Sequence, residues 1–316
     1  MAATRSPRPR PERDERDICR ALTRPDVRSI LGVERRGTLV MGIVNVTSDS
    51  FHAASRAPRV DAAVALAERL VAEGADLLDV GGESTRPGAM PVALDDERER
   101  VLPVITELRR RGHRLPISID TYKAEVARAA VACGATLVND VSGGLLDAEL
   151  PRTVAELGVP VVVGHLRGTP ETMADLARYG DVVADVRSEL AERVADFTAC
   201  GVARERILLD PGIGFAKGAC DNLDLLRRLD ELATGDLDGL PVVLGASRKR
   251  FVAHVMQDAG LAVADDASDR LAGSLAAAVL AAERGAAVVR THDVAETRRA
   301  LAIADAILHE ASTCAR

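Results

Sequence analysis

Eight short polar segments, each placed directly after an apolar run, constrain what this chain can fold into more than any other feature. In order, they are Asn45-Val46-Thr47, residues 81–88, Asp120-Thr121, Asn139-Asp140, His165, Asp210-Pro211-Gly212, Ser247-Arg248-Lys249 and residues 290–293. In a barrel of eight parallel strands every strand ends on the same face, so segments far apart in the sequence meet in one place. The pattern predicts an α/β fold of the (β/α)8 TIM-barrel type, with its chemistry at the carboxyl ends of the strands.

Strand-like and helix-like stretches alternate along the chain. Short apolar runs predict strands at residues 39–44, 77–80, 116–119, 136–138, 160–163, 207–209, 241–244 and 287–289. Helical spacing predicts helices over residues 60–72, 95–111, 124–133, 147–157, 181–200, 222–233, within 250–284, and over 295–309. The strand runs are continuously apolar, as expected for strands covered by helices. An open doubly wound sheet would usually carry a GxGxxG segment after its first strand, and this sequence has none there.

The first 36 residues differ in composition from the rest. They contain ten arginines and six acidic residues, with prolines at positions 7, 9 and 11. Proline and charge leave little that can pack, so we expect a flexible extension over residues 1–36 and a single barrel domain over residues 37–316. Within the barrel, the long connections at residues 49–59 and 164–181 are expected to act as mobile lids.

Length and charge exclude several classes of protein. A chain of 316 residues can bury a sizeable core. No apolar run approaches the roughly 18 residues that a membrane span needs, so no membrane association is expected. The formal net charge of −7 argues against nucleic acid as a partner. The five cysteines are scattered without CxxC spacing, which favours reduced thiols and a cytoplasmic location.

Cationic and imidazole side chains gather at the ends of the second, seventh and eighth predicted strands. They are Arg86, Arg248, Lys249, Arg290 and His292. The loops after strands 7 and 8 are a recurrent phosphate site in this fold, and arginine forks suit phosphate oxygens. Each of these arginines could instead form a surface ion pair, but their convergence predicts an anionic ligand.

Carboxylates and an amide end the third, fourth and sixth predicted strands. Asp120, Asn139 and Asp210 could accept and donate the hydrogen bonds of a flat nitrogen heterocycle, or each could cap a helix or pair with a cation. Three of the four phenylalanines lie close to the polar segments and are candidates for ring walls, with ordinary packing as the alternative. These three are Phe51, Phe215 and Phe251.

Together these segments resemble the dihydropteroate synthase family. The resemblance covers residues 39–300 in order, and Gly42-Ile43-Val44-Asn45-Val46-Thr47 and Asn139-Asp140-Val141-Ser142-Gly143 are among the motifs that carry it. The other motifs are residues 81–89, Ser118-Ile119-Asp120-Thr121, Arg167-Gly168-Thr169-Pro170, residues 210–215, Ser247-Arg248-Lys249 and His292-Asp293-Val294.

The resemblance implies a folate-pathway transferase. Such an enzyme joins 4-aminobenzoate to (7,8-dihydropterin-6-yl)methyl diphosphate, forms 7,8-dihydropteroate and releases diphosphate, with Mg²⁺ as cofactor. It also implies a homodimer. By position, Asn45 would hold Mg²⁺, and the residues assigned to catalysis are Asn45, Arg86, Lys249, Arg290 and His292.

The resemblance also assigns the substrate contacts. Thr85, Arg86, Arg290 and His292 would contact the diphosphate, and Thr291 between the last two is included among the substrate-binding residues. Asp120, Asn139, Asp210 and Lys249 would hold the pterin. Ser247, Phe51 and Phe215 would line the aminobenzoate side.

The sequence departs from the family most in its first loop. Where the family usually has Pro-Asp-Ser-Phe-Ser-Asp-Gly-Gly, residues 48–55 read Ser-Asp-Ser-Phe-His-Ala-Ala-Ser. The alternative function is therefore a pterin-binding paralogue whose transferase activity is altered or lost. Gly164 and Leu166 replace the methionines that usually flank the strand-end histidine, and Ala216 and Ala253 replace usual glycines.

Two other chemistries were weighed. A corrinoid-dependent methyltransferase barrel has no diphosphate to hold, which the cations at Arg86 and Arg290 argue against. A Schiff-base aldolase using Lys249 would need an apolar pocket to desolvate the amine. Arg248 and Arg250 flank the lysine, so no such pocket is expected from the sequence.

Overall fold

The computed structural model describes residues 26–35, 37–46, 56–86, 88–263 and 267–308. Eight parallel strands form a closed barrel in chain order, and β8 pairs with β1 to close it. The strands are β1 (Leu39–Asn45), β2 (Leu77–Gly81), β3 (Ile117–Asp120), β4 (Leu137–Asp140), β5 (Val161–Gly164), β6 (Ile207–Asp210), β7 (Val242–Leu244) and β8 (Ala286–Thr291). The predicted TIM-barrel architecture is confirmed.

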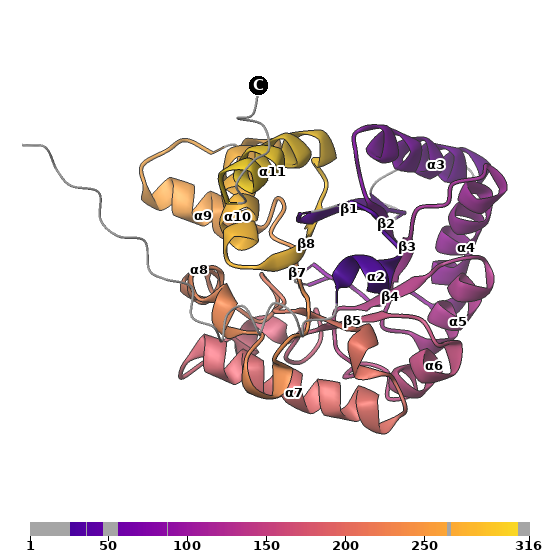
Figure 1. The fold of residues 1–316 in the computed structure, drawn as a ribbon, viewed down its shortest axis with the longest axis horizontal. Helices are drawn as coiled ribbons and strands as arrows, with labels where there is room; N and C mark the ends of the chain where they lie inside the picture. Colours follow the sequence, from indigo (N-terminus) through magenta and orange to yellow (C-terminus); the bar gives the residue numbers. More distant parts are fainter. Residues whose placement is uncertain (1–25, 36, 47–55, 87, 264–266, 309–316) are drawn as a thin grey trace, which may run out of the picture.

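Helices form the outer ring of the molecule (Figure 1). They are α3 (Arg56–Ala72), α4 (Leu94–Arg110), α5 (Ala124–Ala132), α6 (Leu150–Leu157), α7 (Val182–Ala199), α8 (Ala219–Arg227), α9 (Arg250–Asp258), α10 (Leu271–Glu283) and α11 (Val294–Leu308). The largest difference from the sequence prediction is α8, which begins three residues before the predicted 222 and ends six residues before the predicted 233. There the Asp221 carboxylate accepts the Gly218 N–H and caps the first turn.

Side chains alternate between the two faces of each strand and so divide the core into two parts. Val40, Val44 and Val138 belong to the larger core, between the barrel and the helices. Inside the barrel, the residues nearest the amino ends of the strands form an apolar layer made of Leu39, Met41, Leu77, Leu137, Val162, Leu208, Val243 and Val288. The strands are therefore apolar on both faces at their amino ends, as the continuous apolar runs predict.

A short helix before β1 belongs to the barrel. Helix α2 (Val27–Leu31) begins at Asp26, whose side chain accepts the Arg28 N–H, and ends at Gly32 in the left-handed conformation. Leu31 is buried in the interior apolar layer, with Val27, Ile30 and Val33 packed against it. This packing corrects the prediction of a flexible extension for residues 26–35, because the apolar side chains of this segment pack against the interior layer of the barrel. Residues 1–25 lie outside the described part of the chain.

The connection between β5 and α7 is packed rather than open. Met173, in a short 3₁₀ helix (Met173–Leu176), is buried in a cluster with Leu166 and Ala216. Tyr179 donates a hydrogen bond to the Ala216 carbonyl over 2.9 Å. In this structure the loop at residues 164–181, predicted to be a mobile lid, is packed against the loop after β6 through Met173 and Tyr179. Most of the other predicted lid, residues 47–55, lies outside the described residues.

None of the described helices is long and apolar enough to cross a membrane.

Candidate active site

The interior of the barrel changes from apolar to charged near the carboxyl ends of the strands. The inward positions one step above the apolar layer are occupied by Asp79 on β2, Asn139 on β4 and Asp210 on β6, with Asp120 on β3 and Arg290 on β8 completing the set. Register pairs Gly81 with Asp120 and Asp120 with Asn139, so these residues lie side by side on neighbouring strands. Four of the strand-end residues chosen from the sequence, Asp120, Asn139, Asp210 and Arg290, thus lie together at the barrel mouth.

Arg290 lies at the centre of this charged layer. Its Nε donates to Asp79 Oδ2 and its Nη2 donates to Asp120 Oδ2, each over 2.6 Å. Burial opposes the charge of Arg290, but the two facing carboxylates outweigh burial and raise its pKa. Burial raises the pKa of Asp120, while Arg290 acts to lower it. From the sequence, Arg290 was expected to bind an anion together with the other cations at the strand ends. In the structure it pairs with Asp120, one of the residues expected to read a heterocycle, because buried carboxylates require a counter-charge.

Asp79 is a site residue that sequence reasoning missed. Its side chain is fully buried, and its Oδ2 accepts a second hydrogen bond from Asn139 Nδ2 over 3.1 Å. This contact fixes which way the Asn139 amide is turned, since a carboxylate can only accept. The available signal was a single charged residue inside the apolar run of residues 77–80, at an inward position of the strand.

Asp210 and Lys249 form the next part of the mouth. The Gly212 N–H donates to Asp210 Oδ1 over 2.7 Å. Burial raises the pKa of the Asp210 carboxyl, against the effects of that hydrogen bond and of Lys249. Lys249 Nζ lies 3.9 Å from the centre of the Phe215 ring, a cation–π contact. Burial lowers the pKa of Lys249 to about 8, with Arg290 acting in the same direction. The sequence argument that nothing would desolvate Lys249 is therefore wrong, because Phe215 covers it.

Ser247 and His292 meet where β7 and β8 end. Ser247 Oγ lies 3.1 Å from His292 Nδ1 and accepts the His292 backbone N–H over 3.2 Å. The serine proton is then donated to Nδ1, so the ring carries its own proton on Nε2. Burial lowers the pKa of His292 to about 3, with Arg290 acting in the same direction, so the imidazole is neutral near pH 7.

Three other predicted residues are placed differently from the expectation. Thr291 is buried, and its hydroxyl contacts Ser247 and Thr297 of α11, so it faces the helix layer and supports the site from behind. Arg248 adopts a left-handed φ of 58° and pairs with Asp293, Nε to Oδ2 over 3.0 Å. Phe251 packs in the core between barrel and helices rather than in the mouth.

The remaining predicted residues lie at the rim or outside the described residues. Asn45 ends β1 beside Gly81, and its side chain is partly exposed. Thr85 is partly buried and Arg86 is exposed in the loop after β2. Arg86 lies close enough to affect the pKa of both Lys249 and His292. Phe51 and the rest of the unusual loop at residues 48–55 lie outside the described part of the chain.

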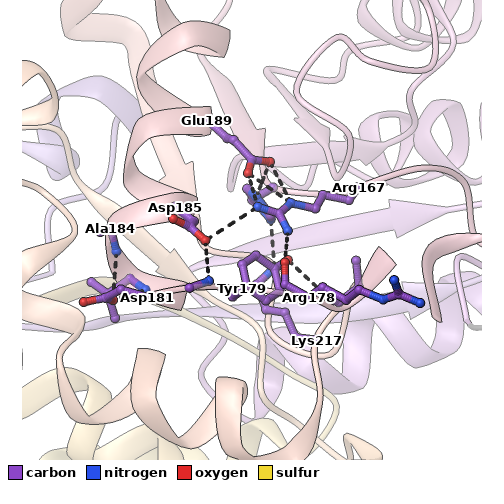
Figure 2. Close-up of polar contacts among 12 residues, drawn as sticks. Arg167, Arg178, Tyr179, Asp181, Ala184, Asp185, Glu189 and Lys217 are labelled. Atoms are coloured by element: carbon purple, nitrogen blue, oxygen red, sulfur yellow. Dashed lines mark hydrogen bonds and ion pairs between the residues drawn. The ribbon is translucent and has the colours of Figure 1, made fainter. Parts of the chain in front are cut away.

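A second polar cluster lies beside the mouth at the end of β5, where the sequence analysis singled out His165 and Arg167 but not their partners Tyr179, Glu189 and Lys217. Figure 2 shows Arg167 between Glu189 of α7 and the Tyr179 ring, with Lys217 below the ring. His165 connects the two halves of this cluster, because its Nε2 lies 3.1 Å from Glu189 Oε2 and its Nδ1 lies 2.8 Å from Lys217 Nζ. The hydrogen-bonded pairs Arg167–Glu189, His165–Glu189 and His165–Lys217 are 22 to 52 positions apart in the sequence, so local spacing does not predict these contacts.

Comparisons with known proteins agree on the kind of molecule that this site belongs to. The model of a family described as pterin binding enzyme matches residues 41–292. The dihydropteroate synthase of Synechocystis sp. is 41% identical over 270 residues, which is 85% of this chain and 90% of that protein. The dihydropteroate synthase of Escherichia coli strain K12 is 40% identical over 269 residues, 85% of this chain and 91% of that protein.

Solved structures give the same result. Xanthomonas albilineans dihydropteroate synthase with 4-aminobenzoic acid has a TM-score of 0.78 at 45% identity and covers 86% of this chain and 94% of its own. The same enzyme in complex with 7,8-dihydropteroate has a TM-score of 0.75 at 43% identity, with the same coverage.

Proposed function

The chain belongs to the family of pterin-binding enzymes, and from this membership we propose that it is a dihydropteroate synthase. It joins (7,8-dihydropterin-6-yl)methyl diphosphate to 4-aminobenzoate, yielding 7,8-dihydropteroate and diphosphate in folate biosynthesis. The observation that carries the proposal is the inward-facing set of Asp120, Asn139 and Asp210 beside Lys249 at the barrel mouth. Relatives at about 40% identity are named for this activity, and one structural neighbour holds its product.

The donor and acceptor pattern of the mouth suits a pterin. Carboxylates at Asp120 and Asp210 can accept the paired N–H bonds of an amino-substituted ring edge. Asn139 offers both a donor and an acceptor, with its orientation fixed by Asp79. Lys249 lies over the Phe215 ring and can donate to ring nitrogen or oxygen acceptors. These groups orient a flat heterocycle and hold it at one depth in the barrel.

The chemistry that follows is displacement at a methylene carbon. The bond between this carbon and the diphosphate oxygen breaks, and a bond to the aniline nitrogen forms with loss of one proton from nitrogen. An electron-rich pterin can stabilise positive charge at the methylene, and buried carboxylates around the ring favour that charge. The protein needs no covalent nucleophile, because holding the two reactants in line supplies much of the rate.

Negative charge develops on the leaving diphosphate and needs nearby donors. Arg86 and the neutral His292 stand at the rim for this task. With its Nδ1 occupied by Ser247, His292 donates through Nε2 rather than as an imidazolium. Thr85 in the same loop adds a hydroxyl. Arg290 contributes its positive charge from within the charged layer of the barrel mouth, while its guanidinium group remains hydrogen-bonded to Asp79 and Asp120.

Mg²⁺ is the cofactor that we propose for this step. The described residues contain no cluster of three or more His, Cys, Asp or Glu side chains suited to a metal. Mg²⁺ commonly binds through substrate phosphates and only one or two protein oxygens, and the Asn45 amide oxygen fits such a small donor set. Bound with the diphosphate, the ion would neutralise charge on the leaving group.

We also propose that the protein is a homodimer located in the cytoplasm. Three large apolar side chains are exposed on the neighbouring helices α10 and α11: Leu280 at 44%, Ile303 at 65% and Ile307 at 77%. Apolar groups gathered on packed helices favour a protein interface. The cytoplasmic location rests on the cysteine spacing alone.

The pterin site is tested by replacing one carboxylate without changing its shape. The variant Asp210→Asn removes the charge that accepts the ring N–H bonds, and we expect pterin diphosphate to bind about tenfold to a hundredfold more weakly. Asp236→Asn, an exposed position in the same half of the chain, is the matched control. Calorimetry gives both affinities, and equal binding by Asp210→Asn and Asp236→Asn would contradict the assignment.

A further inference from the structure

The cluster around His165 lies directly behind the loop that carries Asp210 and Phe215. Lys217 Nζ contacts His165 Nδ1 over 2.8 Å and donates to the Phe215 carbonyl over 3.0 Å. The same loop is held by the Phe215 N–H, which donates to the Gly212 carbonyl over 3.0 Å. The Lys217 ammonium therefore ties the Phe215 end of this loop to His165 at the end of β5.

Lys217 also lies against the glycine that supports Asp210. A Cβ placed on Gly212 would be 3.3 Å from Lys217 Nζ and 2.0 Å from the His165 carbonyl oxygen, so only glycine fits there. Gly212 has a φ of 68°, and its N–H donates to Asp210 Oδ1. The charges of Lys217 and Lys249 both act to lower the pKa of the Asp210 carboxyl, so both lysines lie close enough to act on it.

The hydrogen bonds of the cluster run in one direction. The Lys217 amine donates to His165 Nδ1, which leaves the His165 proton on Nε2 to be donated to Glu189 Oε2 over 3.1 Å. Arg167 Nε donates to Glu189 Oε1 over 3.0 Å, and its guanidinium stacks on Tyr179 at 4.0 Å from the ring centre. Figure 2 shows Glu189 and Tyr179 on opposite sides of Arg167. Lys217 therefore donates to two acceptors, His165 Nδ1 and the Phe215 carbonyl, and these two contacts fix its position.

We propose that Lys217 is a positioning residue for pterin binding: through His165 and Glu189 it holds the Asp210–Phe215 loop in place and keeps a positive charge near the Asp210 carboxylate. This inference rests on the proposed pterin site but not on the transfer reaction. Lys249 lies against Gly214 of this loop, and Lys217 lies against Gly212. Two ammonium groups then act on one buried carboxylate, which needs its charge to accept ring N–H bonds.

The arrangement predicts a pH dependence. Burial lowers the pKa of Lys217 to about 7, while Asp210 and Glu189 act to raise it and Arg167 and Lys249 act to lower it. Burial lowers the pKa of His165 to about 4, so this ring stays neutral near pH 7. The support is complete when Lys217 is protonated, below its pKa, and is lost as the pH rises through it. Pterin binding should weaken across this range, before the titration of Lys249 at about 8 adds its own effect.

The experiment measures binding of (7,8-dihydropterin-6-yl)methyl diphosphate with Mg²⁺ by calorimetry between about pH 5.5 and about pH 9. At the acid end of this range, Lys217→Met should bind the pterin diphosphate about tenfold more weakly than the natural protein does. Its affinity should also show no fall as the pH rises through the pKa of Lys217. Glu189→Gln removes a charge that raises this pKa, so the fall in its affinity should move to lower pH. Glu192→Gln, the same change at an exposed position on α7, should behave as the natural protein.

Two results would overturn the proposed role of Lys217. An unchanged affinity and an unchanged pH profile in Lys217→Met overturn the proposal. So does an equal loss of affinity at every pH that is matched by a lower melting temperature, because that pattern shows a structural role only. Binding is measured without 4-aminobenzoate, so this test does not depend on turnover. If the natural protein failed to form product, the proposed transferase activity would be contradicted, and the binding result for Lys217→Met would still stand.

Discussion

At the scale of single residues, the site depends on buried charges that are shared between partners. Asp79 has no exposed surface and serves both Arg290 and Asn139 through one oxygen. Its other oxygen, Oδ1, has no hydrogen-bond partner among the described residues, and the neighbouring Ser118 Oγ is also buried without one. Such groups are costly in an apolar interior unless a water or a ligand meets them.

Asp79→Asn tests this role. The change keeps the shape but leaves Arg290 with one counter-charge and lets the Asn139 amide turn. We expect the free energy of unfolding to fall by about 3 kcal/mol, as for other broken buried ion pairs, and pterin binding to weaken at least tenfold. Urea unfolding and calorimetry measure the two effects. Asp95→Asn, at a side chain that is 88% exposed on α4, is the control, and matching values for the two variants would refute the role.

Sequence reasoning found the site residues that stand at strand ends and missed those that do not. Asp120, Asn139 and Asp210 were found because each begins a polar segment after an apolar run. Asp79 is hidden within such a run, and Lys217 acts through contacts with residues far away in the chain. Thr291 was assigned to the site because it follows Arg290 directly. Side chains alternate along a strand, so Thr291 points to the opposite face, and its residue type alone does not reveal this.

At the scale of elements, the strands end later than apolar content alone indicates. The strands β2, β3, β4 and β6 were predicted to end at residues 80, 119, 138 and 209, and they extend to Gly81, Asp120, Asp140 and Asp210. The residues at these strand ends still form backbone hydrogen bonds with the neighbouring strand. Their polar side chains point into the barrel mouth or accept hydrogen bonds from the following loop. Asp140, for example, accepts the Ser142 and Gly144 N–H groups and closes its own loop. Backbone pairing therefore overrides polarity at these ends.

Two alanines that replace usual glycines differ in their backbone conformation. Ala216 has a φ of 50°, in the left-handed region, whereas Ala253 lies within helix α9. A non-glycine residue in the left-handed region destabilises the folded state by about 1 to 2 kcal/mol. Glycine in a helix interior destabilises it by about 1 kcal/mol relative to alanine.

Glycine substitutions at the two positions should therefore have opposite effects. We expect Ala216→Gly to raise the free energy of unfolding by up to about 1 kcal/mol, and Ala253→Gly to lower it by about 1 kcal/mol. Urea denaturation of both variants measures the difference. A destabilised Ala216→Gly protein would show that the loop after β6 does not hold the left-handed conformation.

At the scale of the whole molecule, one closed barrel accounts for the convergence of eight distant segments. The sequence predicted this closure, because the segments recur once per strand and all strands run the same way. It did not predict that α2 would plug the amino end, since four apolar residues beside many arginines resemble the rest of the extension. Packing against the barrel interior decides the structure of this helix, and its own composition does not.

The proposed homodimer is tested at the same scale. Ile303→Arg places a charge within the exposed apolar patch of α10 and α11 and should convert a dimer to a monomer in sedimentation equilibrium. Thermal unfolding should change little, because Ile303 is 65% exposed. The exposed Glu192→Gln on the α7 side of the barrel serves as the control. A dimer that persists in Ile303→Arg would place the interface elsewhere.

The most direct test of the central claim is a turnover measurement on the full-length protein. Purified protein is incubated with (7,8-dihydropterin-6-yl)methyl diphosphate, 4-aminobenzoate and Mg²⁺, and 7,8-dihydropteroate and diphosphate are quantified together. A dihydropteroate synthase forms the two products in equal amounts and stops when either substrate is left out. Pterin diphosphate that binds tightly but yields neither product would contradict the claim and identify a pterin-binding paralogue without the transferase reaction.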